Sequence, residues 1–321
     1  MVACRMNDKT NIQHLPVLLD AVVQGLAIHA SGVYVDGTFG RGGHASAILE
    51  QLNSQGHLYA FDKDPEAVRH AHQLFSMDKR FTIFHRSFAE LQASLEQAEV
   101  FGQVQGILLD LGVSSPQLDN PERGFSFNRK GRLDMRMDTS QGLDAKTWLA
   151  TVDEKKLADV LWHYGEERFS RRIAKAIVLA RQQQEIHTTD QLATIITRAM
   201  PRHQPGKHAA TRSFQAIRIF INQELTELDR VLEQAFAALL PGGRLVVISF
   251  HSLEDRKVKL FIQKYERGEQ EAYIPADLPI KVQPFSPRLK RIGSWIKPSE
   301  QEIAKNPRAR SAILRIVEKL P

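Results

Sequence analysis

The sequence predicts an α/β protein with a doubly wound parallel sheet that is interrupted by an all-helical insertion. Over the first third of the chain, short apolar runs alternate with amphipathic stretches, which is typical of βαβ units. This alternation stops near residue 116, no convincing strand follows up to about 210, and a strand pattern returns at 244–250. A chain of 321 residues is long enough for about two such domains.

The first part of the sheet follows from short β-branched and apolar runs. The run at 106–111 is almost entirely apolar, as expected of a strand that is covered on both faces. Pro16 and Pro65 stand where helices would begin, a position that tolerates proline. We expect strands at 33–35, 57–61, 81–84 and 106–111, and helices at 17–28, from the loop after the first strand to 52, and from 65 onward.

The remainder divides into an insertion and a return to the sheet. Apolar periodicity predicts helices at 153–163, 165–184 and 188–200, a loop at 201–211, and one long helical stretch at 213–239. A strand at 244–250, a helix at 253–267, an extended stretch at 280–285 and a last strand at 312–317 follow. We therefore assign 1–115 plus 212–321 to the sheet domain and 116–211 to the helical insertion.

Composition sets limits on the class of protein. Hydrophobic residues make up 42% and charged residues 25%, as in ordinary globular proteins. The single cysteine, Cys4, excludes an intramolecular disulfide and a cysteine-rich zinc site, and the 12 histidines contain no H-E-x-x-H pattern. The first residues lack a signal peptide's apolar segment, and no run of 18 apolar residues exists. We expect a cytoplasmic protein with no metal and no membrane partner.

Charge is distributed unevenly along the chain. The net charge is +6, yet residues 161–220 alone carry +6 and residues 281–321 carry +7, so the rest carries −7. An acidic body with two basic sections is typical of a catalytic core with an anion-facing surface. We expect the two basic sections to converge on the mouth of the ligand pocket.

A glycine-rich loop joins the first strand to the next helix. Its pattern D-G-x-x-G-x-G-G, ending in Gly42 and Gly43, allows a tight turn and a close approach of a ligand to the helix. The pattern matches neither the dinucleotide fingerprint nor a P-loop. Asp62 ends the second strand, where a carboxylate can accept both hydroxyls of a ribose. A nucleoside site without a phosphate cradle favours S-adenosylmethionine over NAD; the alternative is a generic turn followed by a capping aspartate.

A second segment, 110–117, follows the fourth strand at the edge of the sheet where ligands bind. It resembles the [S/D/N]-P-P-[Y/F/W] motif of methyltransferases that act on exocyclic amino groups. Asp110 and the carbonyl groups around Ser114 and Pro116 can hold the hydrogens of a poorly nucleophilic amine. The second proline and the aromatic residue are missing, and Gln117 stands near their place, so base stacking is not expected there. The alternative is a loop terminated by proline.

Longer strings extend the resemblance to nearly the whole chain, from about 14 to 317. They lie at 14–18, 36–44, 107–119, 123–127, 133–138, 164–168, 249–256 and 306–311. Together they resemble the bacterial 16S rRNA cytosine-N4 methyltransferase family (RsmH, formerly MraW). The resemblance implies a class I methyltransferase fold and methyl transfer from S-adenosylmethionine to N4 of the cytidine conventionally numbered 1402, in the small ribosomal subunit. It implies cofactor contacts at Gly42, Gly43, His44, Asp62, Phe88, Asp110 and Gln117.

For three other residues, the sequence leaves two roles open. His251 follows the strand at 244–250, where it can contact the target base or a phosphate, or pack locally beside a helix capped by Ser252. Phe125 and Phe127 either stack on a base or form the seam between the domains. The predicted catalytic set is Asp110, Ser114, Pro116 and His251.

The expected chemistry is a direct displacement, with Asp110 orienting or deprotonating the amine of an unpaired or flipped base. Three rivals remain: an NAD-type oxidoreductase, an RNA-binding assembly factor with a relic pocket, and the same chemistry on DNA or tRNA. The sequence leaves open whether the protein is a monomer or a homodimer.

Overall fold

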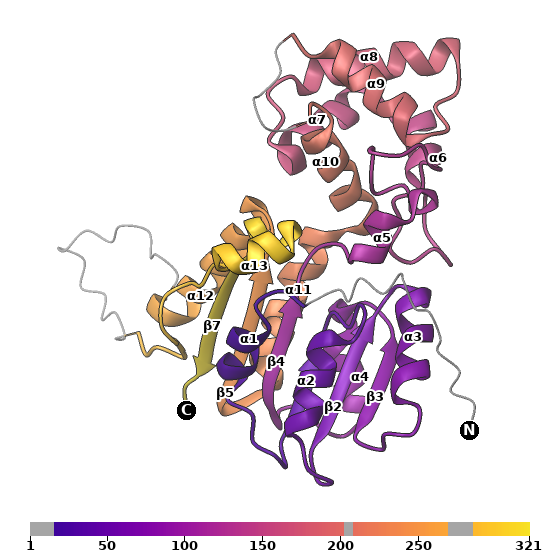
Figure 1. The fold of residues 1–321 in the computed structure, drawn as a ribbon. Helices are drawn as coiled ribbons and strands as arrows, with labels where there is room; N and C mark the ends of the chain where they lie inside the picture. The colour runs from indigo at the N-terminus through magenta and orange to yellow at the C-terminus, as the bar shows by residue number, and fades with distance from the viewer. Residues whose placement is uncertain (1–15, 202–207, 269–284) are drawn as a thin grey trace, which may run out of the picture.

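The computed structural model describes residues 16–201, 208–268 and 285–321. It consists of a sheet with helices on both faces and a helical unit that stands above one end of the sheet (Figure 1). Cys4, Arg202, Lys207 and almost all of the extended stretch expected at 280–285 lie outside the described residues.

The sheet has the strand order β3-β2-β1-β4-β5-β7-β6. Parallel pairing joins the five strands from β3 to β5, and β7 runs antiparallel to both β5 and β6. The order reverses beside β1, which brings the carboxyl ends of β1 and β4 together at a topological switch point. The predicted doubly wound sheet is confirmed. The strands are β1 Val33–Asp36, β2 His57–Asp62, β3 Phe81–His85, β4 Val104–Asp110, β5 Leu239–Ser249, β6 Leu289–Arg291 and β7 Ile313–Lys319.

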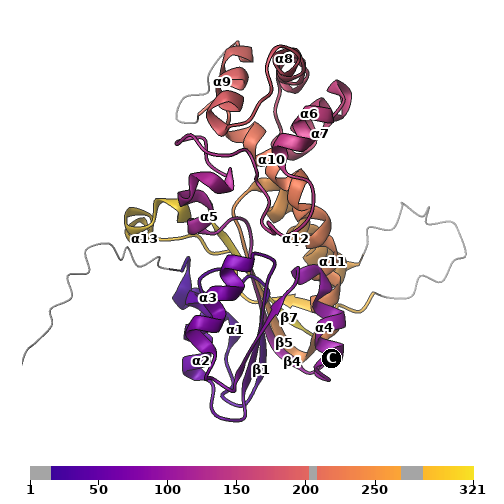
Figure 2. The ribbon, with the colours of Figure 1, turned by 90° about the vertical axis from the view of Figure 1, so that its right-hand side faces the viewer.

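Two hydrophobic layers cover the sheet, as Figure 2 shows with the strands seen nearly edge-on. Side chains alternate between them: Ile107 and Leu109 of β4 face one layer, and Leu108 faces the other. The first layer packs on α4 Leu91–Gln97, α11 Glu224–Ala238 and α12 Ser252–Arg267. The second packs on α1 Leu19–Leu26, α2 Gly43–Gln51 and α3 Pro65–Phe75. A short α13, Glu300–Lys305, precedes β7.

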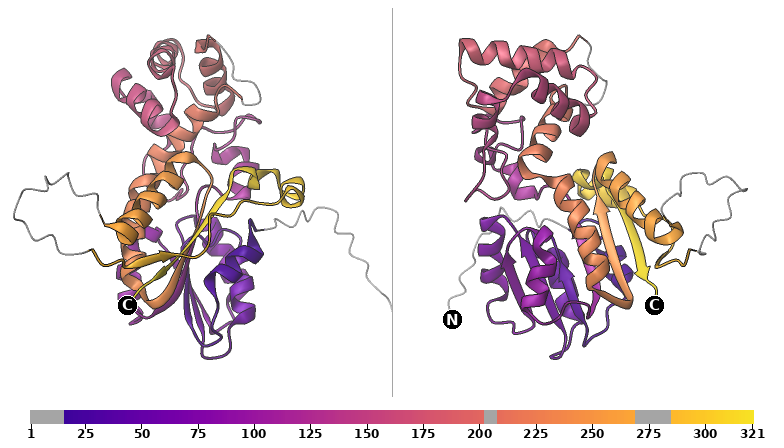
Figure 3. Two further views of the ribbon diagram at one scale, coloured as in Figure 1. Left: turned by 90° about the vertical axis from the view of Figure 1, so that its left-hand side faces the viewer. Right: turned by 180° about the vertical axis from the view of Figure 1, so that it is seen from behind.

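The helical insertion has a hydrophobic core of its own and stands apart from the sheet in both views of Figure 3. Trp148, Leu157, Ile173 and Leu192 belong to this core, which apolar stripes of several helices share. Within the described part of the insertion, the only β pairing is an isolated bridge between Arg132 and Thr188. Its helices are α5 Ser115–Asp119, α6 Ala145–Thr151, α7 Glu154–Gly165, α8 Ser170–Gln183, α9 Thr189–Ala199 and α10 Thr211–Asn222.

The long helix expected at 213–239 is in fact two helices. Gln223 adopts a left-handed conformation, with φ 52° and ψ 29°, which ends α10 before α11 begins. The side chain of Asn222 accepts from Met137 N (2.7 Å) and donates to Met135 O (2.7 Å), which ties the break to the insertion. Phe214 and Ile217 of α10 pack in the insertion core. The packing thus places the junction at Gln223, later than the expected boundary between 211 and 212.

The strand expected at 244–250 begins earlier, at Leu239, with an irregular register opposite Val104 and Gly106. Pro241, Gly242 and Gly243 therefore lie inside β5 rather than before it. No helix in the described part of the chain has the length and apolarity needed to cross a bilayer.

Candidate active site at the carboxyl edge of the sheet

A cavity of ≈ 390 Å³ lies at the carboxyl ends of β1, β2 and β4, between the sheet and the insertion. Gly42 and His251 are not among its lining residues, although both were expected at the site. The other residues predicted from the sequence do line it, namely Gly43, His44, Asp62, Phe88, Asp110, Ser114, Pro116 and Gln117. Residues scattered from 43 to 117 therefore converge on one space.

The glycine-rich loop forms the floor of this cavity. A Cβ on Gly37 would lie 2.6 Å from Leu109 Cδ2, so a larger residue would have to displace the end of the Leu109 side chain. Gly42 has φ 75° and precedes α2, so it turns the backbone rather than facing the cavity. Asp36 at the end of β1 is buried, and its Oδ1 accepts from Thr38 N at 3.0 Å. Burial raises the pKa of Asp36 to about 7.

Asp62 is held with its carboxylate fixed in place. Its Oδ2 accepts from Gly40 N (2.8 Å), and its Oδ1 accepts from Asp64 N (2.8 Å). Each oxygen keeps a further lone pair, so two hydroxyl groups of a ribose can still be bound. Burial raises the pKa of Asp62 to about 6. Phe88 supplies an apolar wall nearby, with its Cβ 3.5 Å from the position that a Cβ on Gly37 would take.

Asp110 ends β4, and its side chain is incompletely bonded. Its backbone N–H donates to Thr38 Oγ1 at 2.7 Å, which fixes the residue to the glycine-rich loop. Its Oδ1 is buried and has no hydrogen-bond partner within the described residues. Burial, reinforced by the charges of Asp36 and Glu254, raises the pKa of Asp110 to about 8. The Asp110 side chain as a whole is 24% exposed and lines the cavity, so Oδ2 is the oxygen that a ligand can reach.

His44 does not supply a positive charge to Asp110. Its Nε2 lies 3.0 Å from the carbonyl oxygen of Val17, which places the ring proton on Nε2. The lone pair of Nδ1 then faces Asp110 Oδ2 at 3.7 Å. Burial lowers the pKa of His44 to about 4, so the ring is neutral near pH 7.

The segment after Asp110 is fixed by a buried network. Gln117 Oε1 accepts from Ser114 N (3.0 Å), and Gln117 Nε2 donates to Asp64 Oδ2 (2.8 Å). Arg123 Nη1 donates to the same Asp64 oxygen at 2.8 Å. Asp64, Gln117 and Arg123 are all at least 94% buried, with exposed fractions of 4%, 5% and 6%. Gln117 therefore holds the loop that carries Ser114 and Pro116, in addition to lining the cavity.

Sequence reasoning missed several charged residues at the cavity, among them Arg218, Glu224 and Glu254. Arg218 donates from Nε and Nη2 to the two carboxylate oxygens of Glu224, at 2.8 and 2.7 Å. Glu254 is 2% exposed, and its Oε2 accepts from Phe250 N at 2.8 Å. These residues lie on three different helices at ordinary helical spacing, so nothing in the sequence marks them as neighbours.

His251 is occupied locally. It takes the N-cap position of α12, which was expected for Ser252, and its Nδ1 accepts from Glu254 N at 3.4 Å. Its Nε2 lies 3.0 Å from Glu254 Oε1. Ligand atoms of Glu224, His251 and Glu254 lie within 4.8 Å of one another, a spacing that a metal ion could use. The guanidinium of Arg218 already neutralises Glu224 there.

The two phenylalanines of the 123–138 segment lie away from the cavity, and Phe127 packs against the insertion core. Phe125 is buried beneath the guanidinium of Arg123, at 5.8 Å from the ring centroid. Phe127 stacks on His208 at 4.5 Å and meets Phe214 edge-on at 5.1 Å, inside the insertion. Neither ring is among the residues that line the cavity.

The two basic sections meet at the cavity only in part. Arg218 of the first section and Arg308 of the second both line it. Arg168, Arg171 and Arg172, also of the first section, line a separate hollow in the insertion.

The strand order, with an antiparallel β7 beside β5 and a nucleoside-sized cavity at the switch point, defines a class I methyltransferase fold. The chain belongs to the MraW methylase family, whose model matches residues 11–320.

Curated relatives match over almost their whole length. "Ribosomal RNA small subunit methyltransferase H" of Coxiella burnetii is 54% identical over 307 residues, covering 96% of this chain and 99% of the relative. The protein of the same name from Legionella pneumophila is 54% identical over 308 residues, with the same coverage. A solved rRNA methylase from Streptococcus thermophilus is 12% identical, with a TM-score of 0.40 over 94% of each chain.

Proposed function

We propose that this protein transfers a methyl group from S-adenosylmethionine to N4 of a cytidine in 16S rRNA of the small ribosomal subunit, in the cytoplasm. Small-subunit rRNA as substrate rests on the names of the 54% identical relatives. The choice of an amino nitrogen rests on one observation, the carboxyl group of Asp110 on the wall of the cavity, whose side chain stays 24% exposed.

The cavity fits S-adenosylmethionine in shape and charge. The loop around Gly37 and Gly40 leaves room for a nucleoside, Asp62 offers acceptors to the ribose, and Phe88 offers an apolar face to adenine. When bound, the cofactor supplies an electrophilic methyl group on a positively charged sulfur. Asp62 and Asp110 line the cavity and can each lose a proton to offset the positive charge of the sulfur.

Asp110 serves the amine of the target base. The N4 amino group of cytosine is conjugated with the ring, so its lone pair is a poor nucleophile until its hydrogens are held. The carboxyl oxygen of Asp110 can accept one of these hydrogens and direct the lone pair toward the methyl carbon. As the new N–C bond forms and the S–C bond breaks, the excess proton leaves the nitrogen for Asp110 or for water. A pKa raised to about 8 makes Asp110 a stronger base than an ordinary carboxylate.

The helical insertion, assigned from sequence to 116–211 and here extended through α10, is the RNA-recognition part of this proposal. It stands over the same edge of the sheet as the cavity (Figure 1), so RNA bound to it can place an unpaired or flipped base beside Asp110.

Methyl transfer can be tested with small subunits from cells that lack this chain. Purified protein and S-adenosylmethionine with a deuterated methyl group are added, and nucleosides from the digested rRNA are analysed by mass spectrometry. We expect deuterated N4-methylcytidine with wild-type protein and a strong decrease with Asp110→Asn. Parallel reactions on tRNA and DNA should give none.

Three outcomes would overturn the proposal. Label on a carbon or oxygen of the nucleoside would exclude amine chemistry. Absence of label from every RNA, with tighter binding of NAD than of S-adenosylmethionine by calorimetry, would favour an oxidoreductase. Binding of S-adenosylmethionine without any transfer would favour an assembly factor.

A further inference from the structure

The insertion carries a hollow of ≈ 610 Å³ that the proposed chemistry does not use. We call it the α7–α8 hollow, because the end of α7 and the first turn of α8 form it. Its lining residues are Ala158, Asp159, Trp162, His163, Arg168, Phe169, Ser170, Arg171 and Arg172. Three arginines face a single acidic residue, so the hollow is positively charged.

The first turn of α8 carries basic side chains, although acidic side chains stabilise the start of an isolated helix. The N-terminus of a helix carries partial positive charge and exposes unbonded N–H groups, so it usually attracts acidic or capping side chains. Here Phe169 at the N-cap provides no side-chain hydrogen bond, and the first turn contains no acidic residue. Instead Arg171 and Arg172 occupy it, both exposed. The buried Glu167 carboxylate, just before the helix, accepts from Phe169 N at 3.0 Å, so the exposed arginines are the groups left for an external anion.

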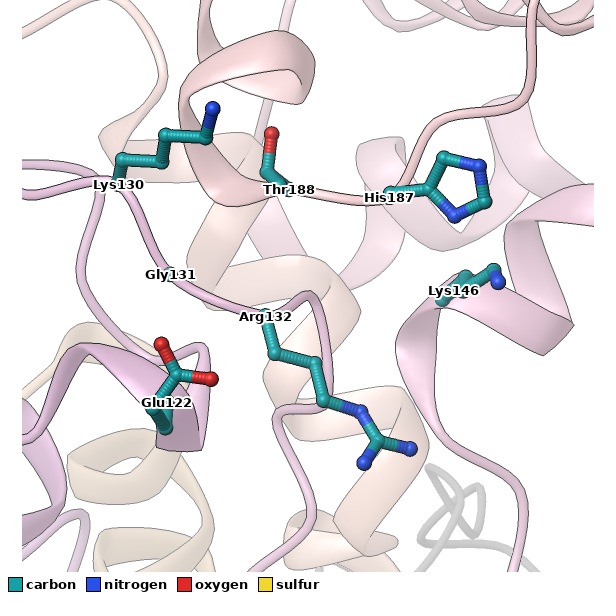
Figure 4. Close-up of a pocket in the computed structure, with 7 residues that line it drawn as sticks. All are labelled: Glu122, Lys130, Gly131, Arg132, Lys146, His187 and Thr188. Carbon is teal, nitrogen blue, oxygen red and sulfur yellow. The ribbon is translucent and has the colours of Figure 1, made fainter.

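The arginines of the α7–α8 hollow have no ion-pair partner within the described residues; this holds for Arg168, Arg171 and Arg172. A second basic hollow, of ≈ 560 Å³, makes the contrast clear (Figure 4). There Arg132 Nη2 lies 3.2 Å from Asp144, while Lys146 and His187 lie 3.9 and 3.3 Å from Glu185. Arg132 and Lys146 of the second hollow thus already have carboxylate partners in the chain, whereas Lys130 forms no ion pair among the described residues.

An exposed aromatic ring completes the α7–α8 hollow. Trp162 keeps 53% of its surface exposed, although tryptophan usually buries its large apolar face. Indole rings beside arginines are a common platform for an unpaired base, because the base stacks on the ring while the cations bind the flanking phosphates. The combination matches a single-stranded nucleic acid better than a free small anion, which would not use Trp162.

The hollow is anchored to the methyltransferase domain. Glu166, which follows α7, accepts hydrogen bonds from Ser252 Oγ (3.0 Å) and Arg256 Nη2 (3.1 Å) at the start of α12. Glu254 of the same helical turn lines the cofactor cavity. RNA bound in the hollow is therefore held at a fixed position relative to Asp110.

We propose that the α7–α8 hollow binds a single-stranded segment of the RNA substrate, with a phosphate at the first turn of α8 and a base stacked on Trp162. The statement that this RNA is the methylation substrate rests on the proposed function. The statement that the hollow binds single-stranded RNA does not.

The test uses the full-length protein and a fluorescein-labelled single-stranded 12-mer RNA, with affinity measured at several salt concentrations. Arg171→Ala/Arg172→Ala should weaken binding by about tenfold and reduce the slope of log affinity against log salt, since each lost phosphate contact on a single strand removes about 0.7 from it. Trp162→Ala should weaken binding by about fivefold or more with an unchanged slope. Each variant should raise KM for small subunits more than it lowers kcat, and should leave S-adenosylmethionine affinity unchanged.

The matched control is Arg132→Ala/Lys146→Ala, which removes two cations from the hollow of Figure 4. We expect a smaller loss of affinity, because carboxylates of the chain already neutralise these side chains. Wild-type RNA affinity in the α7–α8 variants, or a larger effect in the control, would overturn the proposal. Failure of the proposed function is seen separately, as wild-type protein that binds the 12-mer but methylates no rRNA.

Discussion

The cofactor cavity and the α7–α8 hollow are built on opposite electrostatic principles. The cavity is lined by carboxyl groups whose pKa values are raised, such as Asp62 and Asp110, and backbone N–H groups hold the carboxylate of Asp62 in place. The hollow exposes arginines that the described chain does not neutralise. A buried charge is energetically costly and is kept where a ligand or a hydrogen-bond network compensates it. An exposed charge costs little and attracts a partner of opposite charge. The comparison separates a preorganised chemical site from a docking surface.

The largest effect should come from Asp110, at the centre of the acidic cavity. Asp110→Asn keeps the shape of the side chain but removes the basic oxygen that receives the proton. We expect turnover at saturating S-adenosylmethionine to fall by about 10²- to 10⁴-fold. Single-turnover methylation of small subunits measures this effect, and a variant with wild-type turnover would remove Asp110 from the chemistry.

The junction between the sheet and the helical insertion depends on the buried ion pair of Arg123 and Asp64. Arg123→Ala leaves the Asp64 carboxylate buried without its cation, which should lower the free energy of unfolding by about 3–5 kcal/mol. Urea unfolding monitored by tryptophan fluorescence provides the measurement. The control Arg256→Ala breaks an exposed pair with Glu166 and should cost at most about 1 kcal/mol. Equal losses in the two variants would show that the junction is not a buried network.

Asp62 should control affinity for the cofactor without controlling RNA binding. Asp62→Ala removes the acceptors of two ribose hydroxyls, and calorimetry should show S-adenosylmethionine binding that is roughly hundredfold weaker. Asp20→Ala, an exposed aspartate of α1, is the control. Because Asp62 also accepts from Gly40 and Asp64, thermal melting must show that the variant is folded. Unchanged cofactor affinity in a folded variant would contradict the assignment.

The smallest expected effect is the release of a proton when S-adenosylmethionine binds. With its pKa raised to about 8, Asp110 is largely protonated at pH 7 in the free protein, and the cofactor's positive sulfur should expel that proton. Calorimetry in buffers of different ionisation enthalpy should then report release of up to about one proton for each S-adenosylmethionine bound, and less in Asp110→Asn. Proton uptake, or equal release in the two proteins, would contradict the pKa assignment.

The same raised pKa affects folding. The unfolded chain loses the Asp110 proton near its ordinary pKa of 3.8, whereas the native protein keeps it up to about 8. The contribution of Asp110 to stability therefore falls as the pH rises across this interval.

The sequence predicted well what is encoded locally. The glycine-rich loop, Asp62 and Asp110 each follow a strand, so the parallel sheet alone brings them to one edge. What depends on packing was missed. Gln223 has no local signal for a helix break, because its left-handed conformation is imposed by the contacts of Asn222 with the 135–137 segment. Arg218 and Glu254 meet only because α10 and α12 converge, and Trp162 looks like any apolar helix position until its exposure is known.

We propose above all that the protein produces N4-methylcytidine in small-subunit rRNA and that this reaction requires Asp110. The most direct measurement is nucleoside mass spectrometry of rRNA from cells lacking this chain, complemented either by the wild-type gene or by one encoding Asp110→Asn. The account predicts that N4-methylcytidine is lost without the chain, returns with wild type, and stays absent or strongly reduced with the variant. Full N4-methylcytidine in the deleted strain, or full restoration by Asp110→Asn, would contradict it.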